Sequence, residues 1–312
     1  MSARPDEAAP QVSPTQFNGF VSKEAQELFE SRYWTKSYPP GVSGDMPPLR
    51  YTSMLELVAE CLKKYADRPA FVSAGTEFSY KQVDDMSDQF AGYLKSIGVK
   101  AGDVVAIMLP NCVQFPVCFV GAMKLGCTLT NVNPLYTVRE LNHQLKDSGA
   151  TTIVVFENFA NTLQQSLDGT KVKNIVITQL GDLLGGLKGL IVNFVMRKIK
   201  KMVPAYNLPQ AVPIKKALAA GRGVAFPKPN PQLDDVALLQ YTGGTTGVSK
   251  GAMLTQRNLM SNMEQGLAWM SEAIGKEPIC VVTMLPLYHI YALAVNCMLF
   301  MTFGARNILI AN

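Results

Sequence analysis

The chain has 312 residues, of which 48% are hydrophobic and 17% charged, and its formal net charge at pH 7 is +5. A hydrophobic fraction of this size can supply a sizeable core and excludes an intrinsically disordered chain. The small net charge gives no support to a nucleic-acid-binding protein, and no apolar stretch reaches the roughly 18 residues of a membrane-spanning helix.

Residues 1–50 are predicted to form an amino-terminal arm or tail. Prolines recur through the first 48 residues and favour irregular structure. A short helix is expected near Lys23–Arg32, and the arm is expected to lie on a partner surface. The segment Met1–Pro10 contains two acidic residues and no apolar core, so no secretory signal is expected.

From Tyr51 onward, the spacing of apolar residues predicts an alternation of helices and strands. This rhythm is typical of fold class α/β, with mostly parallel sheets flanked by helices. In chain order the expected elements are a helix capped by Thr52 or Ser53, a hairpin of strands 70–73 and 76–79, a helix over 83–97, a strand over 104–109, a helix over 114–125, a strand over 127–130, a helix from Thr137 to Gly149, strands over 153–156 and 174–178 around another helix, strands over 234–239, 279–283 and 307–310, and a buried helix over 292–301.

The chain stops at Asn312, just after the last expected strand, where an α/β unit normally continues into a crossover helix. We therefore expect further sequence beyond Asn312 and interpret residues 51–312 as an incomplete domain. The six cysteines form no Cys-x-x-Cys pair and mostly lie in apolar runs. Buried reduced thiols are expected rather than disulfides or metal ligands, and this favours a reducing, cytoplasmic location.

The stretch Tyr241–Gly251, here called the glycine–threonine loop, carries the strongest chemical signal. Its sequence YTGGTTGVSKG follows an expected strand and contains four glycines, three threonines and one lysine. Glycines let backbone N–H groups converge on an anion, threonine hydroxyls add donors, and Lys250 adds a mobile positive charge. The pattern predicts a phosphate-binding loop, and a flexible turn between two strands is the alternative.

Two common nucleotide-binding motifs do not fit the glycine–threonine loop. A Walker A motif needs Ser or Thr directly after its lysine, whereas Gly251 follows Lys250 here. The G-x-G-x-x-G fingerprint of dinucleotide-binding domains is absent from the loop. A P-loop NTPase and a Rossmann-type cofactor site are therefore disfavoured.

The glycine–threonine loop closely resembles the phosphate-binding signature of the adenylate-forming superfamily, which includes acyl-CoA synthetases, luciferases and peptide-synthetase adenylation domains. One position departs from the usual pattern, because Ser249 stands where the family commonly has proline. Further stretches that resemble the family are residues 102–111, 121–134, 257–259 and 285–289. The resemblance covers about Tyr51 to Asn312. The spacer 182–208 and the tetrapeptide 287–290 make it most similar to bacterial long-chain fatty acid–CoA ligases.

The resemblance implies an enzyme that activates a long-chain fatty acid with ATP and Mg²⁺ to an acyl-adenylate and then transfers the acyl group to CoA. The residues that it assigns to the ATP phosphates are Thr242, Gly243, Gly244, Thr245, Thr246, Gly247 and Lys250. Thr242 would also help to hold Mg²⁺, and Lys250 and His289 would be the catalytic residues. His289 would orient the acyl carboxylate, with a purely structural histidine as the alternative; His143 receives no role. The 312 residues alone are expected to be inactive.

Residues 183–203 combine an apolar helix with a cationic end and contain no acidic residue. Two interpretations stay open: peripheral contact with an anionic membrane, at the inner membrane face, or a helix packed on its own protein with a solvated basic tip. The expected partners are fatty acid, ATP and CoA, with a homodimer and no nucleic acid. The alternative functions are a ligase for another carboxylic acid and a non-catalytic fragment that binds a membrane or a partner.

Overall fold

The computed structural model describes residues 22–242, 248–270, 274 and 278–311. The chain divides into two compact units, residues 1–47 and 48–312. In the first unit, helix α1 (Lys23–Glu30) is capped by Ser22, whose hydroxyl accepts a hydrogen bond from Ala25 N, and a 3₁₀ turn, η2 (Tyr33–Ser37), follows. The prediction of a short helix in this region is confirmed.

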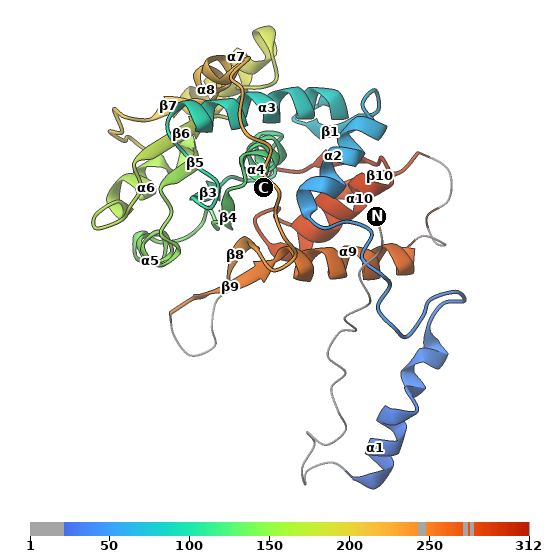
Figure 1. The fold of residues 1–312 in the computed structure, drawn as a ribbon. Helices are drawn as coiled ribbons and strands as arrows, with labels where there is room; N and C mark the ends of the chain where they lie inside the picture. The colour runs from blue at the N-terminus through green and yellow to red at the C-terminus, as the bar shows by residue number, and fades with distance from the viewer. Residues whose placement is uncertain (1–21, 243–247, 271–273, 275–277, 312) are drawn as a thin grey trace. The chain divides into compact units, whose positions relative to one another are not determined.

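The second unit builds two sheets (Figure 1). The larger sheet contains β3 (Val104–Met108), β4 (Thr128–Asn131), β5 (Thr152–Phe156), β6 (Asn174–Thr178), β7 (Val212–Pro213), β8 (Val236–Thr242) and β9 (Lys250–Thr255). Its strand order is β7-β6-β5-β3-β4-β8-β9, and the pairs are parallel apart from the antiparallel pair β8–β9. The predicted α/β class with mostly parallel strands is confirmed.

The smaller sheet joins strands from both ends of the second unit. It contains β1 (Pro69–Ser73), β2 (Thr76–Ser79), β10 (Cys280–Thr283) and β11 (Arg306–Leu309) in the order β10-β11-β1-β2. The predicted hairpin is present as the antiparallel pair β1–β2. Strand β1 also pairs in parallel with β11, more than 200 residues later, and no sequence pattern could indicate that pairing.

Helices cover both faces of the larger sheet, which explains why its strands read as continuous apolar runs. The helices of the second unit are α2 (Met54–Lys64), α3 (Tyr80–Ser96), α4 (Gln114–Leu125), α5 (Val138–Ser148), α6 (Ala160–Ser166), α7 (Gly186–Phe194), α8 (Ile214–Gly221), α9 (Gln256–Met270) and α10 (Phe300–Thr302), with the 3₁₀ turn η3 (Glu157–Phe159) and the π-helical segments η4 (Val195–Ile199) and η5 (Ala292–Leu299). Side chains alternate along a strand. Ala106 and Met108 accordingly join the core of α5 and α6, while Val105 and Ile107 join the core of α3, α4 and α8.

Local sequence fixes several helix ends where they were expected. Thr137 and Glu140 form the predicted capping box of α5, and Ser53, rather than Thr52, caps α2. Helix α4 ends at Gly126, whose φ of 83° lies in the left-handed region that glycine adopts without strain. The expected buried helix over 292–301 is present, although its first eight residues are π-helical.

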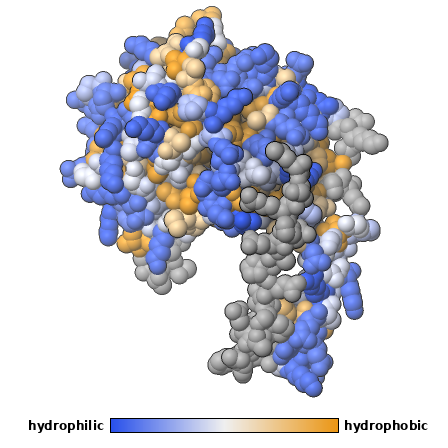
Figure 2. All heavy atoms as spheres, viewed as in Figure 1, coloured by the Kyte–Doolittle hydropathy of each residue, from blue (hydrophilic) through white to orange (hydrophobic). Residues whose placement is uncertain are grey.

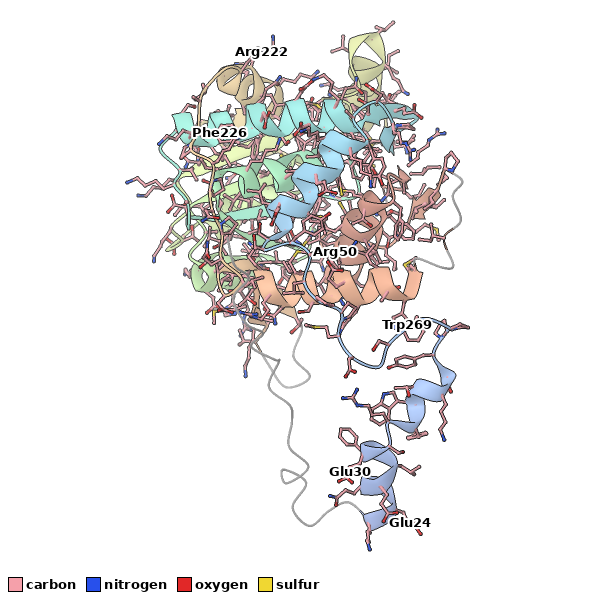
Figure 3. The ribbon with its side chains drawn as sticks, turned by 45° about the vertical axis from the view of Figure 1, so that its right-hand side comes forward. Glu24, Glu30, Arg50, Arg222, Phe226 and Trp269 are labelled. Atoms are coloured by element: carbon pink, nitrogen blue, oxygen red, sulfur yellow. The ribbon has the colours of Figure 1, made fainter. Side chains whose placement is uncertain are left out.

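The start of the second unit is fastened to α9. Arg50 lies beside α9 (Figure 3). Its Nε atom lies 2.9 Å from Oε2 of the buried Glu264, and Gln256 accepts a hydrogen bond from Met54 N at 2.9 Å. These contacts join the chain before α2 to a helix about 200 residues later. They make α9 part of the same core as α2.

All six cysteines are free thiols. Five are buried and Cys280 is exposed on β10, an edge strand of the smaller sheet. Burial raises the pKa of Cys112 to about 12. The expectation of buried thiols is therefore confirmed for five cysteines and wrong for Cys280.

Candidate active site

The glycine–threonine loop joins two neighbouring antiparallel strands. Strand β8 ends at Thr242 and β9 begins at Lys250, and these two exposed residues pair directly across the ladder. Two of the predicted phosphate-binding residues thus stand together at the base of the loop. The predicted residues that lie outside the described part of the chain are Gly243, Gly244, Thr245, Thr246 and Gly247.

The base of the loop contacts one face of α5. The Tyr241 hydroxyl donates a hydrogen bond to Asp147 Oδ2 at 2.5 Å, and His143 Nε2 lies 2.9 Å from the carbonyl oxygen of Ser249. A carbonyl oxygen only accepts, so this histidine nitrogen carries a proton and donates. Burial, and then the hydrogen bond to Asp147, raises the pKa of Tyr241, which keeps its hydroxyl protonated as the donor.

Gly251 leaves room for the Tyr241 ring. The two residues pair across the β8–β9 ladder, and a Cβ atom at position 251 would lie 2.9 Å from two atoms of that ring. Real Cβ contacts are longer, so a side chain here would push the ring away from Asp147. The loop sequence predicted glycine as an anion-binding residue, and the structure adds this packing role at Gly251.

His289 lies in an exposed turn immediately before a helical segment that begins at Ile290. Its backbone N–H donates to Pro286 O at 2.9 Å and its carbonyl accepts from Leu293 N at 3.0 Å. The backbone is therefore fixed while the ring remains accessible. The Nδ1 atom of the ring accepts a hydrogen bond from Tyr291 N at 3.4 Å, so His289 is exposed but its ring is oriented by the following backbone, unlike a histidine buried in the core.

Asn111 pins the segment that leads to His289. It is 4% exposed, and its Nδ2 donates to Thr283 O at 3.1 Å and to Leu285 O at 3.0 Å. Its Oδ1 accepts from Leu287 N at 2.8 Å. The sequence pointed to Asn111 only as part of a family-like stretch, since nothing local shows that an amide after β3 will bind a segment 170 residues away.

Gln240 connects the loop to the His289 turn. Its Nε2 lies 3.4 Å from the carbonyl oxygen of Tyr288, and its register partner across the parallel β4–β8 pair is Asn131. Both amides are buried. Within the described residues, the side-chain amide of Asn131 and the Gln240 Oε1 atom have no hydrogen-bond partner. Sequence reasoning missed both, because a single amide in an apolar strand forms no motif.

These residues place the site at the carboxyl ends of the parallel strands, the edge at which α/β sheets bind ligands. A separate cavity of about 450 Å³ lies at the amino ends of the parallel strands, lined by Gly102, Gly126, Thr128 and Val236 among others. Thr128 begins β4 and Val236 begins β8. That cavity is therefore remote from Thr242 in the sheet and is not part of the candidate site.

The fit of Mg²⁺ depends on oxygen ligands. The described part of the chain contains no cluster of three or more His, Cys, Asp or Glu residues suited to a metal ion. Mg²⁺ in nucleotide sites takes most of its ligands from phosphates and water, with one or two from the protein. The exposed Thr242 hydroxyl fits that arrangement as a single protein ligand.

Helix α7 turns its apolar side outward. Leu187, Leu190 and Phe194 are 71%, 63% and 58% exposed, and hydrophobic surface covers the top of the view where α7 lies (Figure 2). The inward side is small and polar: Gly189 packs against Gly181, and Asn193 accepts from Gly181 N at 2.7 Å. Val192 also packs from α7 against the core. The interpretation of a helix packed on its own protein therefore holds for one side of α7 and is wrong for its exposed apolar residues.

The basic residues of segment 183–203 have two different environments. Arg197 forms an ion pair of 3.0 Å with the buried Glu157, which also accepts a hydrogen bond from the Tyr206 hydroxyl. Arg197 therefore belongs to the protein's own packing. The exposed lysines of the segment are Lys188, Lys198, Lys200 and Lys201. Among the described residues, no helix is both long and apolar enough to cross a membrane.

A family profile described as AMP-binding enzyme matches residues 58–312, a span that includes the glycine–threonine loop, Asn111 and His289. The chain belongs to the AMP-binding enzyme family. The match begins within α2 and contains all of the larger sheet. The departure at Ser249 therefore does not remove the chain from the family.

Several named relatives and solved structures indicate which kind of AMP-binding enzyme the chain is similar to. A long-chain-fatty-acid–CoA ligase of Salmonella typhimurium is 46% identical over 284 residues, which cover 90% of this chain and 50% of the relative. One from Haemophilus influenzae is 41% identical over 285 residues, with the same coverage. The structure of a long-chain-fatty-acid-CoA ligase from Archaeoglobus fulgidus superposes with a TM-score of 0.67 at 22% identity, over 88% of this chain and 50% of that one, which supports the fold. The chain spans about half the length of the curated relatives it matches.

Proposed function

We propose that the protein carrying this chain is an ATP-dependent long-chain fatty acid–CoA ligase, in which residues 51–312 form an incomplete amino-terminal adenylation domain behind an arm of residues 1–50. The observation that carries the proposal is the glycine–threonine loop, with Thr242 opposite Lys250 at its base. The 46% identity to a ligase of that name supports the choice of acid.

The reaction has two steps. A carboxylate oxygen of the acid attacks the α-phosphorus of ATP, the bond to pyrophosphate breaks, and an acyl-adenylate forms. The sulfur of CoA then attacks the acyl carbonyl, AMP leaves, and the thiol proton is released. Both reactants of the first step are anions, so fixed N–H donors and a positive charge at the phosphates must offset their repulsion.

The proposed site residues act on two groups, the ATP phosphates and the carboxylate of the acid. Lys250 gives a charge-assisted contact to the β- and γ-phosphates. The hydroxyl of Thr242 would help to hold Mg²⁺, which would neutralise phosphate charge. His289 orients the attacking carboxylate, an assignment supported by its exposed ring and fixed backbone. The remaining loop residues assigned to the phosphates are Gly243, Gly244, Thr245, Thr246 and Gly247.

Product analysis of the complete gene product, with any sequence beyond residue 312, tests this proposal. It should convert ATP, CoA and palmitate to palmitoyl-CoA, AMP and pyrophosphate, and should use benzoate and acetate far less well. Preference for benzoate or acetate would favour the ligase for another acid. Absence of both ATP binding and product would favour the non-catalytic alternative.

We also propose that the protein is cytoplasmic and that α7 and η4 make peripheral contact with an anionic membrane, at the inner membrane face. The support is the outward apolar face of Leu187, Leu190 and Phe194 beside four exposed lysines, with no acidic residue from 183 to 203. Apolar side chains enter the headgroup region while lysines meet anionic lipids, each worth about 1 kcal/mol near the surface. A membrane is also a source of long-chain fatty acid.

Vesicle sedimentation tests the membrane contact. The variant that replaces Lys188, Lys198, Lys200 and Lys201 by Gln should lose the preference for anionic over neutral vesicles; Arg197 is kept because Glu157 needs it. The matched control makes the same change of charge elsewhere, at Lys171, Lys173, Lys215 and Lys216. Equal sedimentation of the wild type and both variants with anionic vesicles would refute the contact.

We also propose that the protein forms a homodimer. In the unit of residues 1–47, α1 buries none of its residues, and Leu28 and Tyr33 are about half exposed. Sedimentation equilibrium of the complete protein tests it. A concentration-independent monomer mass would rule the homodimer out.

A further inference from the structure

Helix α5 contacts both ends of the glycine–threonine loop, and neither the family match nor the proposed reaction assigns a role to those contacts. We propose that His143 and Asp147 are positioning residues, which hold the two strands at the base of the loop so that Lys250 and Thr242 meet the ATP phosphates. The inference rests on the proposed phosphate-binding function of the loop.

The need for an anchor follows from the position of β9. Among the described residues it is the last strand of the larger sheet, and its ladder hydrogen bonds run to β8 alone. An edge strand with one ladder has little to fix its end. His143 and Asp147 stand one helical turn apart and so share a face of α5. Asp147 holds Tyr241, the first residue of the glycine–threonine loop, and His143 holds Ser249 near the end of the loop.

The contact of His143 acts directly on Lys250. The carbonyl of Ser249 and the N–H of Lys250 belong to one planar peptide group and point in opposite directions. The hydrogen bond from His143 to that carbonyl therefore fixes the direction of the Lys250 N–H and the start of its side chain. Ser249 lacks the fixed φ of a proline, so this peptide group has more freedom for the histidine to remove.

Asp147 acts through Tyr241. Its carboxylate holds the Tyr241 hydroxyl at 2.5 Å, and the Tyr241 ring fills the space above Gly251 on the opposite strand. The His143 and Tyr241 rings also form a T-shaped pair, with centroids 6.4 Å apart. The aspartate, tyrosine and histidine thus form one cluster between α5 and the loop.

The test measures acid-dependent ATP–pyrophosphate exchange by the complete gene product, with KM determined separately for ATP and for palmitate. His143→Ala should raise the KM for ATP about three- to tenfold, the range of one hydrogen bond, and leave the KM for palmitate unchanged. His143→Gln, whose amide can donate to the same carbonyl, should restore the wild-type KM for ATP. Asn142→Ala is the matched control, because Asn142 also donates to two backbone carbonyls from α5, at Ser166 and Asp168, away from the loop.

Three results would overturn the proposal. The first is an unchanged KM for ATP in His143→Ala while Lys250→Ala impairs exchange, which leaves the proposed function standing. The second is an equal rise in the KM for ATP in Asn142→Ala, which reduces the effect to helix stability. The third is wild-type exchange by both His143→Ala and Lys250→Ala, which removes the phosphate-binding function together with the positioning role.

Discussion

Replacement of Asn111 by Ala removes three hydrogen bonds from the segment before His289. Each such bond contributes about 0.5–1.5 kcal/mol, and a buried polar group left without a partner costs about 1–3 kcal/mol. The atoms affected are two carbonyl oxygens, at Thr283 and Leu285, and the Leu287 N–H. The structure therefore predicts a loss of about 2–4 kcal/mol in the free energy of unfolding.

Urea unfolding of the wild type, Asn111→Ala and Asn111→Asp measures this loss. The aspartate keeps an acceptor for Leu287 N but places a buried carboxylate against the carbonyl oxygens of Thr283 and Leu285, so its free energy of unfolding should be no higher than that of Asn111→Ala. Asn230→Ala, at an exposed position, is the control for the substitution itself and should change little. A loss below about 1 kcal/mol in Asn111→Ala would refute the assigned role of this amide.

Three further predictions concern thiols and the loop. Burial raises the pKa of Cys112 to about 12, so the stability that this thiol contributes is complete below the unfolded pKa near 8.5 and is lost as pH rises toward 12. The free energy of unfolding in urea should therefore be about 2 kcal/mol lower at pH 10 than at pH 8 because of this thiol. Cys112→Ala should reduce that difference. Thiol labelling of the native chain should modify Cys280 rapidly and the five buried cysteines slowly, and rapid labelling of several thiols would contradict their burial. Gly251→Ala should displace Tyr241 and cost about 1–3 kcal/mol of stability; an unchanged urea midpoint would show that the ring has room to move.

Local signals predicted most elements of the fold. Thr137 with Glu140, and Gly126 after Leu125, mark helix ends through contacts within a few residues, so the sequence alone contains the necessary information. Long-range pairing is different. The parallel pairing of β1 with β11 depends on packing between segments more than 200 residues apart, and the sequence predicted strands there without placing them in a second sheet.

The site shows the same division. Thr242 and Lys250 were predicted from residue type and spacing, because glycines, threonines and a lysine in one loop suit phosphate chemistry. His143, Asn111 and Gln240 were not, because each acts through a contact with a distant backbone group. On α7 the composition was informative but the orientation was not, since only the structure shows Gly189 and Asn193 inward and the leucines outward.

Acid-dependent ATP–pyrophosphate exchange by Lys250→Ala in the complete gene product tests the central claim most directly. One charge-assisted contact to phosphate contributes about 1.5–3 kcal/mol, so exchange should fall by roughly ten- to a hundredfold. Lys215→Ala, an exposed lysine on α8, serves as the control and should retain the wild-type rate. Wild-type exchange by Lys250→Ala would contradict the assignment of the glycine–threonine loop to the ATP phosphates.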